Sequence, residues 1–324
     1  MQVHEGAAAL LLAAILDYLI GDPWGWPHPV QLMGAIANEI TQGSIRILAQ
    51  GWQRRLAGIG LGLGLILGSG LIGWIIVRAA WLLHPLAGFL LESVLLASCF
   101  AGRSLRLAAT DVLRPLGEGN LELARRQLSL YVGRDTGGLS REEILRAILE
   151  TVAENAVDGV TAPLFYAIAG ACLPGVGSVP LALAYKAAST LDSTVGYRRE
   201  PYTNIGWFSA KLEDRLTWLP CRLTVLTLAL LSRQPRRVLA LCRRDAPRDR
   251  SPNSGWSECV YAAILGVQLG GMNTYSGVVV AKPKLGEPLH PITAESIMRS
   301  LQLTRICFLL WLLGGIGAAT YFKM

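Results

Sequence analysis

Apolar residues along the chain occur in long blocks that are separated by polar segments. The clearest block runs from Leu56 to Leu83 with Arg78 as its only charge, and a second runs from Leu303 to Phe322. A helix needs about 20 apolar residues to cross a bilayer core of about 30 Å, so each block is long enough to span a membrane. Neither block alternates apolar and polar residues, which argues against membrane β-strands. The pattern predicts at least two helical spans, and roughly four to seven in all.

The remaining apolar blocks are near or below the lower length limit for a simple span. We expect them to be tilted spans, re-entrant hairpins or buried helices. They are Gly6–Ile20, Pro85–Phe100, Gly159–Leu173, Val179–Leu191, Leu216–Leu231 and Cys259–Leu269. The fold class predicted from this pattern is an all-α, polytopic integral membrane protein with helical cytoplasmic loops. We expect one membrane-embedded domain over residues 1–324.

The composition supports a membrane protein, since 52% of the residues are apolar and 16% are charged, against about 25% charged in an ordinary soluble domain. The six cysteines and four histidines are scattered, so a structural zinc site is not expected. The net charge of +7 comes largely from Arg233–Arg250, which holds seven arginines and two aspartates. A basic run of this kind is typical of a cytoplasmic loop under the positive-inside rule. We therefore expect contact with membrane lipid and no nucleic-acid partner.

Glycines recur through the first long block. Gly68-Ser-Gly70-Leu-Ile-Gly73 even fits the G-x-G-x-x-G pattern of dinucleotide sites. That pattern requires a preceding strand and a βαβ unit, whereas here it lies inside a membrane helix. Small residues four apart allow helices to pack closely. We therefore interpret the glycines of this block as a packing surface; they are Gly58, Gly60, Gly62, Gly64 and Gly68.

Three carboxylates follow one another at helical spacing in the segment 101–158. Ser140 and Glu143 have the spacing of a capping box, and a helix is predicted from there to about Val157. Glu150, Glu154 and Asp158 lie at i, i+4 and i+8 and would stack on one side of it. Two interpretations remain open, a solvated face and a partly buried site. Buried carboxylates require cations such as Mg²⁺, a basic side chain or a substrate amine.

Other polar segments carry weaker signals. Arg134 and Asp135 are flanked by glycines, which fits either a phosphate-binding loop or a local ion pair. Lys186 and Asp192 stand at opposite ends of an apolar segment, where ionisable groups are usually functional, although a lysine also reaches an interface by its long side chain. Ser251–Glu258 is a polar turn that leads into an apolar helix.

Together these segments resemble the adenosylcobinamide-phosphate synthases, the CobD/CbiB family of cobalamin biosynthesis. The likeness begins with Asp17–Pro23 and Pro27–Val30 and runs in order over most of the chain. It continues in Val132–Thr136, Glu150–Phe165, Tyr185–Tyr197, Gly206–Trp207, Ser209–Ala210, Trp218–Leu223, Ser251–Glu258 and Gly266–Gly271. Ala156, Glu213 and Thr217 depart from the family pattern, which weakens any role for these three positions.

The resemblance implies a reaction, the formation of an amide between adenosylcobyric acid and (R)-1-aminopropan-2-ol O-phosphate or aminopropanol itself. ATP is consumed and adenosylcobinamide phosphate is the product. Such a reaction requires Mg²⁺ held by carboxylates, basic groups for the phosphates and a base near the amine. The substrates are cytoplasmic, so we expect the motif-bearing segments, about 101–158, 192–215 and 232–258, on the cytoplasmic face of the bacterial cell membrane.

The resemblance and this chemistry give a set of candidate site residues. Glu154, Asp158 and Lys186 are predicted to be catalytic, and Asp192 and Asp214 to bind the metal. The predicted substrate-binding residues are Asp22, His28, Arg134, Asp135, Asn155, Tyr197, Arg198, Asn253, Ser254 and Glu258.

Two topological expectations follow from placing the motifs on one face. Leu216–Leu231, which carries Pro220 and Arg222, should be interfacial or buried rather than spanning, and Gly159–Leu191 should form a hairpin. Further partners are expected among other membrane-bound enzymes of cobalamin synthesis. The alternative function is a membrane transporter or corrinoid-binding membrane protein, which ionisable groups within broken helices would suit. The internal symmetry expected of a transporter is missing from the sequence.

Overall fold

The computed structural model describes residues 3–321 except 23–24, 26–27 and 198. The chain forms two compact units, which are described separately. Unit 1 comprises Met1–Arg103, Ala162–Thr217 and Leu309–Met324, and unit 2 comprises Ser104–Thr161 and Trp218–Phe308. Three helices contribute residues to both units: α5 (Gly102–Gly117), α11 (Trp207–Leu231) and α14 (Ala294–Tyr321). The prediction of a single membrane-embedded domain is not tested by this division, which concerns contacts within the chain.

Three apolar stretches are long enough to cross a membrane, and they confirm the all-α membrane fold. They are α3 (Gly51–Leu83), the stretch Pro85–Gly117, and α14. A break after α4 (Pro85–Ala97) divides the second stretch before α5 begins. Leu67, Leu71 and Ile75 of α3 are at least half exposed, as expected of a helix whose outer face meets lipid rather than water. The two blocks predicted as spans correspond to α3 and α14.

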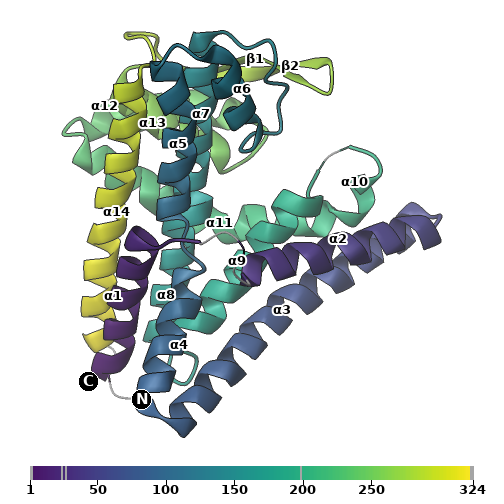
Figure 1. The fold of residues 1–324 in the computed structure, drawn as a ribbon, viewed down its shortest axis with the longest axis vertical. Coiled ribbons are helices and arrows are strands. Elements are labelled where there is room, and N and C mark those ends of the chain that lie inside the picture. Colours follow the sequence, from purple (N-terminus) through teal and green to yellow (C-terminus); the bar gives the residue numbers. More distant parts are fainter. Residues whose placement is uncertain (1–2, 23–24, 26–27, 198, 322–324) are drawn as a thin grey trace. The chain divides into compact units, whose positions relative to one another are not determined.

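Unit 1 is a helical bundle in which α3 packs along α9 and beside α4 (Figure 1). Its other helices are α1 (Val3–Leu19), α2 (Pro29–Ile47), α8 (Ala162–Cys172), α9 (Ser178–Val195) and α10 (Tyr202–Ile205). Helices α8 and α9 are joined by a short turn and pack together, which confirms the predicted helical hairpin. Helix α11 is long but is not among the helices apolar enough to span, in agreement with the expectation for Leu216–Leu231.

The glycines of α3 separate into two faces. A Cβ atom at Gly58 would lie 2.0 Å from the carbonyl oxygen of Ile205, and one at Gly62 would lie 2.6 Å from the Phe208 ring. A Cβ at Gly60 or Gly64 would meet nothing within 4 Å. The prediction of a glycine packing surface is therefore confirmed for the face that carries Gly58 and Gly62. It is wrong for Gly60, Gly64 and Gly68, because an added Cβ at these positions meets no atom within 4 Å.

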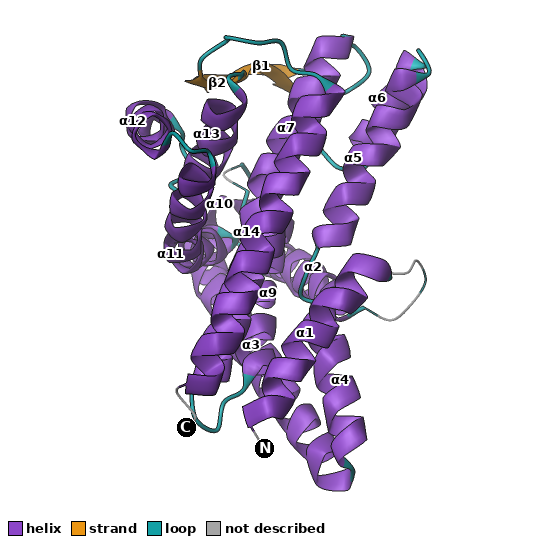
Figure 2. Ribbon diagram, turned by 90° about the vertical axis from the view of Figure 1, so that its left-hand side faces the viewer, coloured by secondary structure: helices purple, strands orange, loops and turns teal. Residues whose placement is uncertain are grey.

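Unit 2 combines short helices with the only sheet among the described residues. The helices are α6 (Leu121–Ser129), α7 (Arg141–Asn155), a π-helical turn (Ala156–Thr161), α12 (Pro235–Asp245), a 3-10 turn (Ala246–Arg248) and α13 (Ser254–Leu265). Strands β1 (Gln268–Tyr275) and β2 (Val278–Gly286) form an antiparallel hairpin. Helix α13 packs on α7 and on both strands, and the hairpin lies across the ends of α7 and α13 (Figure 2).

Helix α7 begins as predicted and ends differently. The Ser140 hydroxyl accepts a hydrogen bond from the Glu143 amide at 3.2 Å, and the Glu143 carboxylate accepts one from the Ser140 amide at 2.8 Å. This capping box satisfies two of the free amides at the helix start. The α-helix stops at Asn155 and continues as a π-helical turn. Asp158 therefore lies outside the regular helix that carries Glu150 and Glu154.

Candidate active site

Glu150 is a buried carboxylate with several hydrogen-bond donors around it. Helix α7 presents it to the hairpin, where the Gly270 amide donates to it at 2.9 Å. The Arg134 guanidinium donates to its other oxygen, and Arg146 lies 3.5 Å away, one helical turn earlier. Its side chain is 2% exposed. A buried charge is tolerated when cations and hydrogen-bond donors surround it, and Glu150 meets that requirement within the protein.

The segment that carries Arg134 and Asp135 holds the hairpin in place. Arg134 also donates to the Asn273 side chain at 2.9 Å. The Asp135 carboxylate accepts hydrogen bonds from the amides of Ser276 and Gly277, at 3.1 and 2.8 Å, in the turn between the strands. The structure thus shows contacts within the protein for both side chains. Their predicted role in substrate binding stays a prediction.

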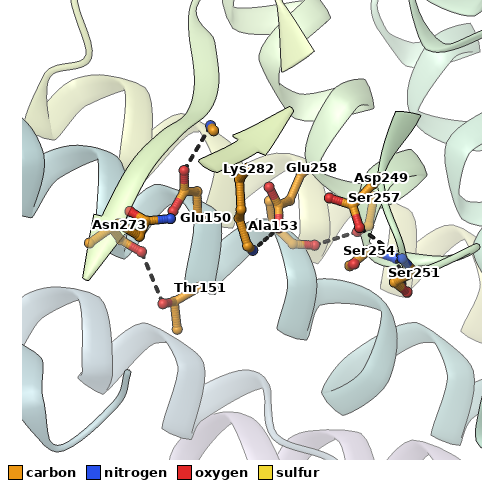
Figure 3. A network of polar contacts seen from close by, with 12 residues as sticks. Glu150, Thr151, Ala153, Asp249, Ser251, Ser254, Ser257, Glu258, Asn273 and Lys282 are labelled. Atoms are coloured by element: carbon orange, nitrogen blue, oxygen red, sulfur yellow. Dashed lines mark hydrogen bonds and ion pairs between the residues drawn. The ribbon is translucent and has the colours of Figure 1, made fainter. Parts of the chain in front are cut away.

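Glu258, at the start of α13, has a different environment. Its side chain is 1% exposed, and the Lys282 amino group on β2 lies 3.6 Å from one of its oxygens. Neither carboxylate oxygen accepts a hydrogen bond from any described residue. Figure 3 shows the Lys282 side chain pointing towards Glu258, with Glu150 and Asn273 to one side. Glu258 is therefore a buried anion with a nearby cation and no hydrogen-bond donor among the described residues.

Burial controls the ionisation of this cluster. Desolvation raises the pKa of Glu258 to about 8, against the lowering effect of Lys282. Desolvation also raises the pKa of Glu154. Lys282 lowers this pKa, whereas Asp249 and Glu150 raise it further. Burial alone would lower the pKa of Lys282, but the surrounding carboxylates raise it overall. A carboxyl group with a pKa near neutrality is suited to accept and release a proton during catalysis.

The turn before α13 is fixed by its own hydrogen bonds. The Ser251 hydroxyl accepts from the amides of Asn253 and Ser254 at 3.2 and 3.1 Å, and the Asp249 carboxylate accepts from the Ser251 amide at 2.8 Å. Ser257 donates to the Ala153 carbonyl of α7, which joins the two helices beside Glu258 (Figure 3).

Several predicted residues thus come together in unit 2. Glu154 and Glu258 belong to one electrostatic cluster, because the charge of Glu154 raises the pKa of Glu258. The Arg134 guanidinium lowers the pKa of Glu154. Asn253 and Ser254 belong to the turn next to it. Asn155 is exposed on α7, and Asp158 is not among the charges that act most strongly on Glu154 or Glu258.

The other predicted residues lie in unit 1. His28 is 2.9 Å from the Asp22 carboxylate, and Asp22 and Lys186 both act electrostatically on the Cys99 thiol. Lys186 and Asp192 lie on α9, and Asp214 lies on α11. The Tyr197 hydroxyl donates to the Ser193 carbonyl at 2.8 Å. Arg198 lies outside the described residues.

The described side chains do not form a resident metal site. Among them, no three histidine, cysteine, aspartate or glutamate side chains converge to hold a metal ion. Mg²⁺ commonly binds through one or two carboxylates together with substrate phosphates. The assignment of Asp192 and Asp214 as metal ligands stays a prediction.

Sequence reasoning missed the residues that the hairpin brings to the cluster, chiefly Lys282, Asn273 and Gly270. Val278–Ala281 is rich in β-branched residues, and Ser276-Gly277 before it is a hairpin-turn signal. Pro283 within the run weakens that signal, because proline is rare inside strands. Arg146 was also missed. It lies four residues before Glu150 on α7, and its guanidinium donates to the Gly270 carbonyl and, at 3.0 Å, to the Met272 carbonyl.

Comparison with known proteins identifies relatives of the whole chain. The chain matches the family model described as CobD/Cbib protein over residues 10–304. It is 56% identical to the cobalamin biosynthesis protein CobD of Synechocystis sp. over 304 residues, which cover 94% of this chain and 89% of the relative. It is 43% identical to the protein of the same name from Halalkalibacterium halodurans, with 95% and 96% coverage.

A further relative is the cobalamin biosynthesis protein CbiB of Salmonella arizonae, 40% identical with 91% of this chain and 92% of the relative covered. No solved structure matches the chain significantly. The family match extends over nearly the whole chain and includes all the segments that form the buried cluster of unit 2. The chain therefore belongs to the CobD/CbiB family.

Proposed function

We propose that this protein is a membrane enzyme of cobalamin biosynthesis that joins adenosylcobyric acid to (R)-1-aminopropan-2-ol O-phosphate, or to aminopropanol, in an ATP-dependent reaction. The family match and the names of the relatives support the cobalamin pathway. The observation that carries the assignment as an enzyme is the buried cluster of Glu154, Glu258 and Lys282. A purely structural subunit has no need of a buried carboxylate without hydrogen-bond donors.

The chemistry begins with a carboxylate, which is a poor electrophile. Transfer of the ATP γ-phosphoryl group to the corrinoid carboxylate would give an acyl phosphate and ADP. The amine nitrogen then attacks the acyl carbon, the bond from that carbon to the phosphate oxygen breaks, and inorganic phosphate leaves. The amine must lose protons to a base on the way to the amide. The reaction therefore requires an anionic base, cations for the phosphates and a site that excludes water.

Residues of this chain suit these duties. Desolvation raises the pKa of Glu154, and it raises the pKa of Glu258 to about 8, so Glu258 is suited to accept a proton near neutral pH. Lys186 and Arg198 are the proposed cations for phosphate groups, and Asp158 stays a proposed catalytic carboxylate. Mg²⁺ supplies charge neutralisation for the transferring phosphoryl group when it is bound, and Asp192 and Asp214 are the residues proposed to hold it.

The orientation in the membrane belongs to the same proposal. ATP and the corrinoid are cytoplasmic, and the arginine-rich α12 segment favours the cytoplasmic side. We therefore place the catalytic segments at the cytoplasmic face of the cell membrane, in contact with lipid and with other membrane-bound enzymes of the pathway.

Mass spectrometry of the reaction mixture tests this function. Purified protein is incubated with adenosylcobyric acid, aminopropanol phosphate, Mg²⁺ and ATP, and in parallel with unphosphorylated aminopropanol. The expected result is a product with the mass of the condensed amide, formed only when ATP is present. A folded, monodisperse sample that forms no product with either amine would contradict the proposal and favour a transporter or corrinoid-binding protein.

A further inference from the structure

The charges that act most strongly on Glu258 include more carboxylates than cations. The strongest fields at this carboxylate come from Lys282, Glu150, Glu154 and Asp249. Glu150 has Arg134 and Arg146 as its cations, whereas Lys282 lies beside Glu258 and interacts electrostatically with Glu154. Four carboxylates, Glu150, Glu154, Asp249 and Glu258, thus stand against three cations, Arg134, Arg146 and Lys282. One added positive charge would neutralise the fully ionised cluster.

The hydrogen bonding of Glu258 is also incomplete. Its side chain is 1% exposed, and neither oxygen has a donor among the described residues. The Lys282 amino group lies 3.6 Å away, which is an ion-pair distance but longer than a hydrogen bond. A buried carboxylate is costly unless donors satisfy its lone pairs. The group that completes this site must therefore bring N–H or O–H donors as well as positive charge.

A primary ammonium ion meets both requirements better than a chelated metal. It carries one positive charge and three N–H donors, and the Lys282 side chain shows that such a group is accommodated beside Glu258. No three metal-binding side chains converge in the part of the chain that the structure describes. Glu154 and Lys282 each keep part of their surface exposed, so the cluster is not fully closed off from solvent.

We propose that Glu258 and Glu154 bind the protonated amine of the amino alcohol substrate, with Lys282 completing the charge balance of the cluster. The inference rests on the proposed function only in taking an amine as a substrate. Bound in this way, the ammonium donates hydrogen bonds to the carboxylates. One carboxylate takes a proton from the nitrogen, which frees the lone pair to form the C–N bond as phosphate leaves the acyl carbon.

Binding measured by calorimetry on the full-length protein in detergent tests this assignment. The ligands are (R)-1-aminopropan-2-ol O-phosphate and isopropyl phosphate, which keeps the phosphate and lacks the amine. We expect the wild type to prefer the amine by at least about tenfold, as one charge-assisted hydrogen bond would give. Glu258→Gln should lose that preference. Glu287→Gln is the matched control, because Glu287 pairs with Arg237 and Arg244 away from the cluster.

A second variant covers the case in which Glu258→Gln does not fold. Glu154→Gln alters a partly exposed side chain and should reduce the same preference by several fold. Retention of the full preference in a folded Glu258→Gln protein, or in Glu154→Gln if only that variant folds, would overturn the assignment. The assignment would also be overturned if Glu258→Gln or Glu154→Gln lost Mg²⁺ binding, measured with Mg²⁺ alone, and kept the preference for the amine.

The outcomes also separate this assignment from the proposed reaction. If the wild type forms the amide and Glu258→Gln still discriminates for the amine, the reaction stands and the amine site is wrong. If Glu258→Gln abolishes amine-dependent binding and the wild type forms no product, the amine site stands and the proposed ligase reaction is wrong.

Discussion

Glu150 and Glu258 are both buried carboxylates of unit 2, and they differ in the contacts that they make. Glu150 accepts from a backbone amide and from the Arg134 guanidinium, with Arg146 close by. Glu258 has one ammonium group at 3.6 Å and no hydrogen-bond donor among the described residues. Glu150 is therefore explained by the folded protein alone, because its contacts secure the hairpin to α7. Glu258 is not, which is why we assign it to a ligand.

The largest expected effect comes from removing the charge of Glu150. Glu150→Gln would leave the buried guanidinium group of Arg134 and the partly exposed one of Arg146 without their carboxylate. Breaking a buried ion pair in this way costs about 3–5 kcal/mol of stability. Thermal unfolding in detergent, followed by circular dichroism, should show a clearly lowered Tm or failure to fold. An unchanged Tm would mean that this ion-pair network does not hold the hairpin.

Glu258→Gln should have the opposite profile, with activity lost and stability kept. Loss of a general base typically lowers kcat/KM by about 100-fold or more. The loss of folding stability should be smaller than in Glu150→Gln, because no hydrogen bond from the described residues is removed. Turnover in the amide-forming assay and Tm are measured on the same preparations. A stability loss as large as that of Glu150→Gln would erase the distinction between the two carboxylates.

The pH dependence sharpens the comparison, since the pKa of Glu258 is raised to about 8 by desolvation. Amine binding requires the carboxylate form, so affinity for the amine should rise roughly 25-fold between about pH 6.5 and pH 8.5. Isopropyl phosphate should not show this rise, and neither should Glu258→Gln. The charged groups that act most strongly on Glu258 are Lys282, Glu150, Glu154 and Asp249.

The stability of the wild type should fall as pH rises, whereas its affinity for the amine increases. A carboxyl group whose pKa is higher in the folded state contributes stability below its unfolded pKa of 4.5. That contribution is lost as pH rises towards about 8. Glu258→Gln should flatten this part of the curve of Tm against pH. A wild-type Tm that rises over the same range would contradict the raised pKa.

The smallest expected effect concerns the turn of the hairpin. Asp135→Asn weakens the exposed hydrogen bonds from the amides of Ser276 and Gly277, which should cost about 1 kcal/mol locally. Hydrogen exchange should then speed up at residues 274–278, with little change in α7. Equal acceleration throughout unit 2 would show that the turn and the ion-pair network form one cooperative structure.

The amino-acid sequence predicts those features that depend on residues close together in the chain. The capping box of Ser140 and Glu143, the long apolar helices and the spacing of Glu150 and Glu154 follow from neighbours a few residues apart, and the structure confirms these elements. The α8–α9 hairpin was also predictable, because two apolar blocks are separated by a short glycine-rich turn.

The rest of the site depends on partners that are distant in the chain. Arg134 meets Asn273 across 139 residues, and no local pattern indicates that pairing. Arg134 and Asp135 fit a phosphate-binding loop from their glycine neighbours, whereas the structure gives both of them contacts to the hairpin. Lys282 lies in a strand interrupted by Pro283, so its approach to Glu258 becomes evident only when the hairpin is placed.

The contact between Glu150 and the Gly270 amide spans 120 residues, and this sets an order of events during synthesis. At about 5–20 residues per second, the ribosome needs on the order of ten seconds to make the hairpin after α7 has emerged. Throughout that interval Glu150 lacks the backbone donor that it has in the finished protein. The nascent α7 must therefore stay hydrated or be shielded by another protein, and the pocket is completed only when the hairpin docks.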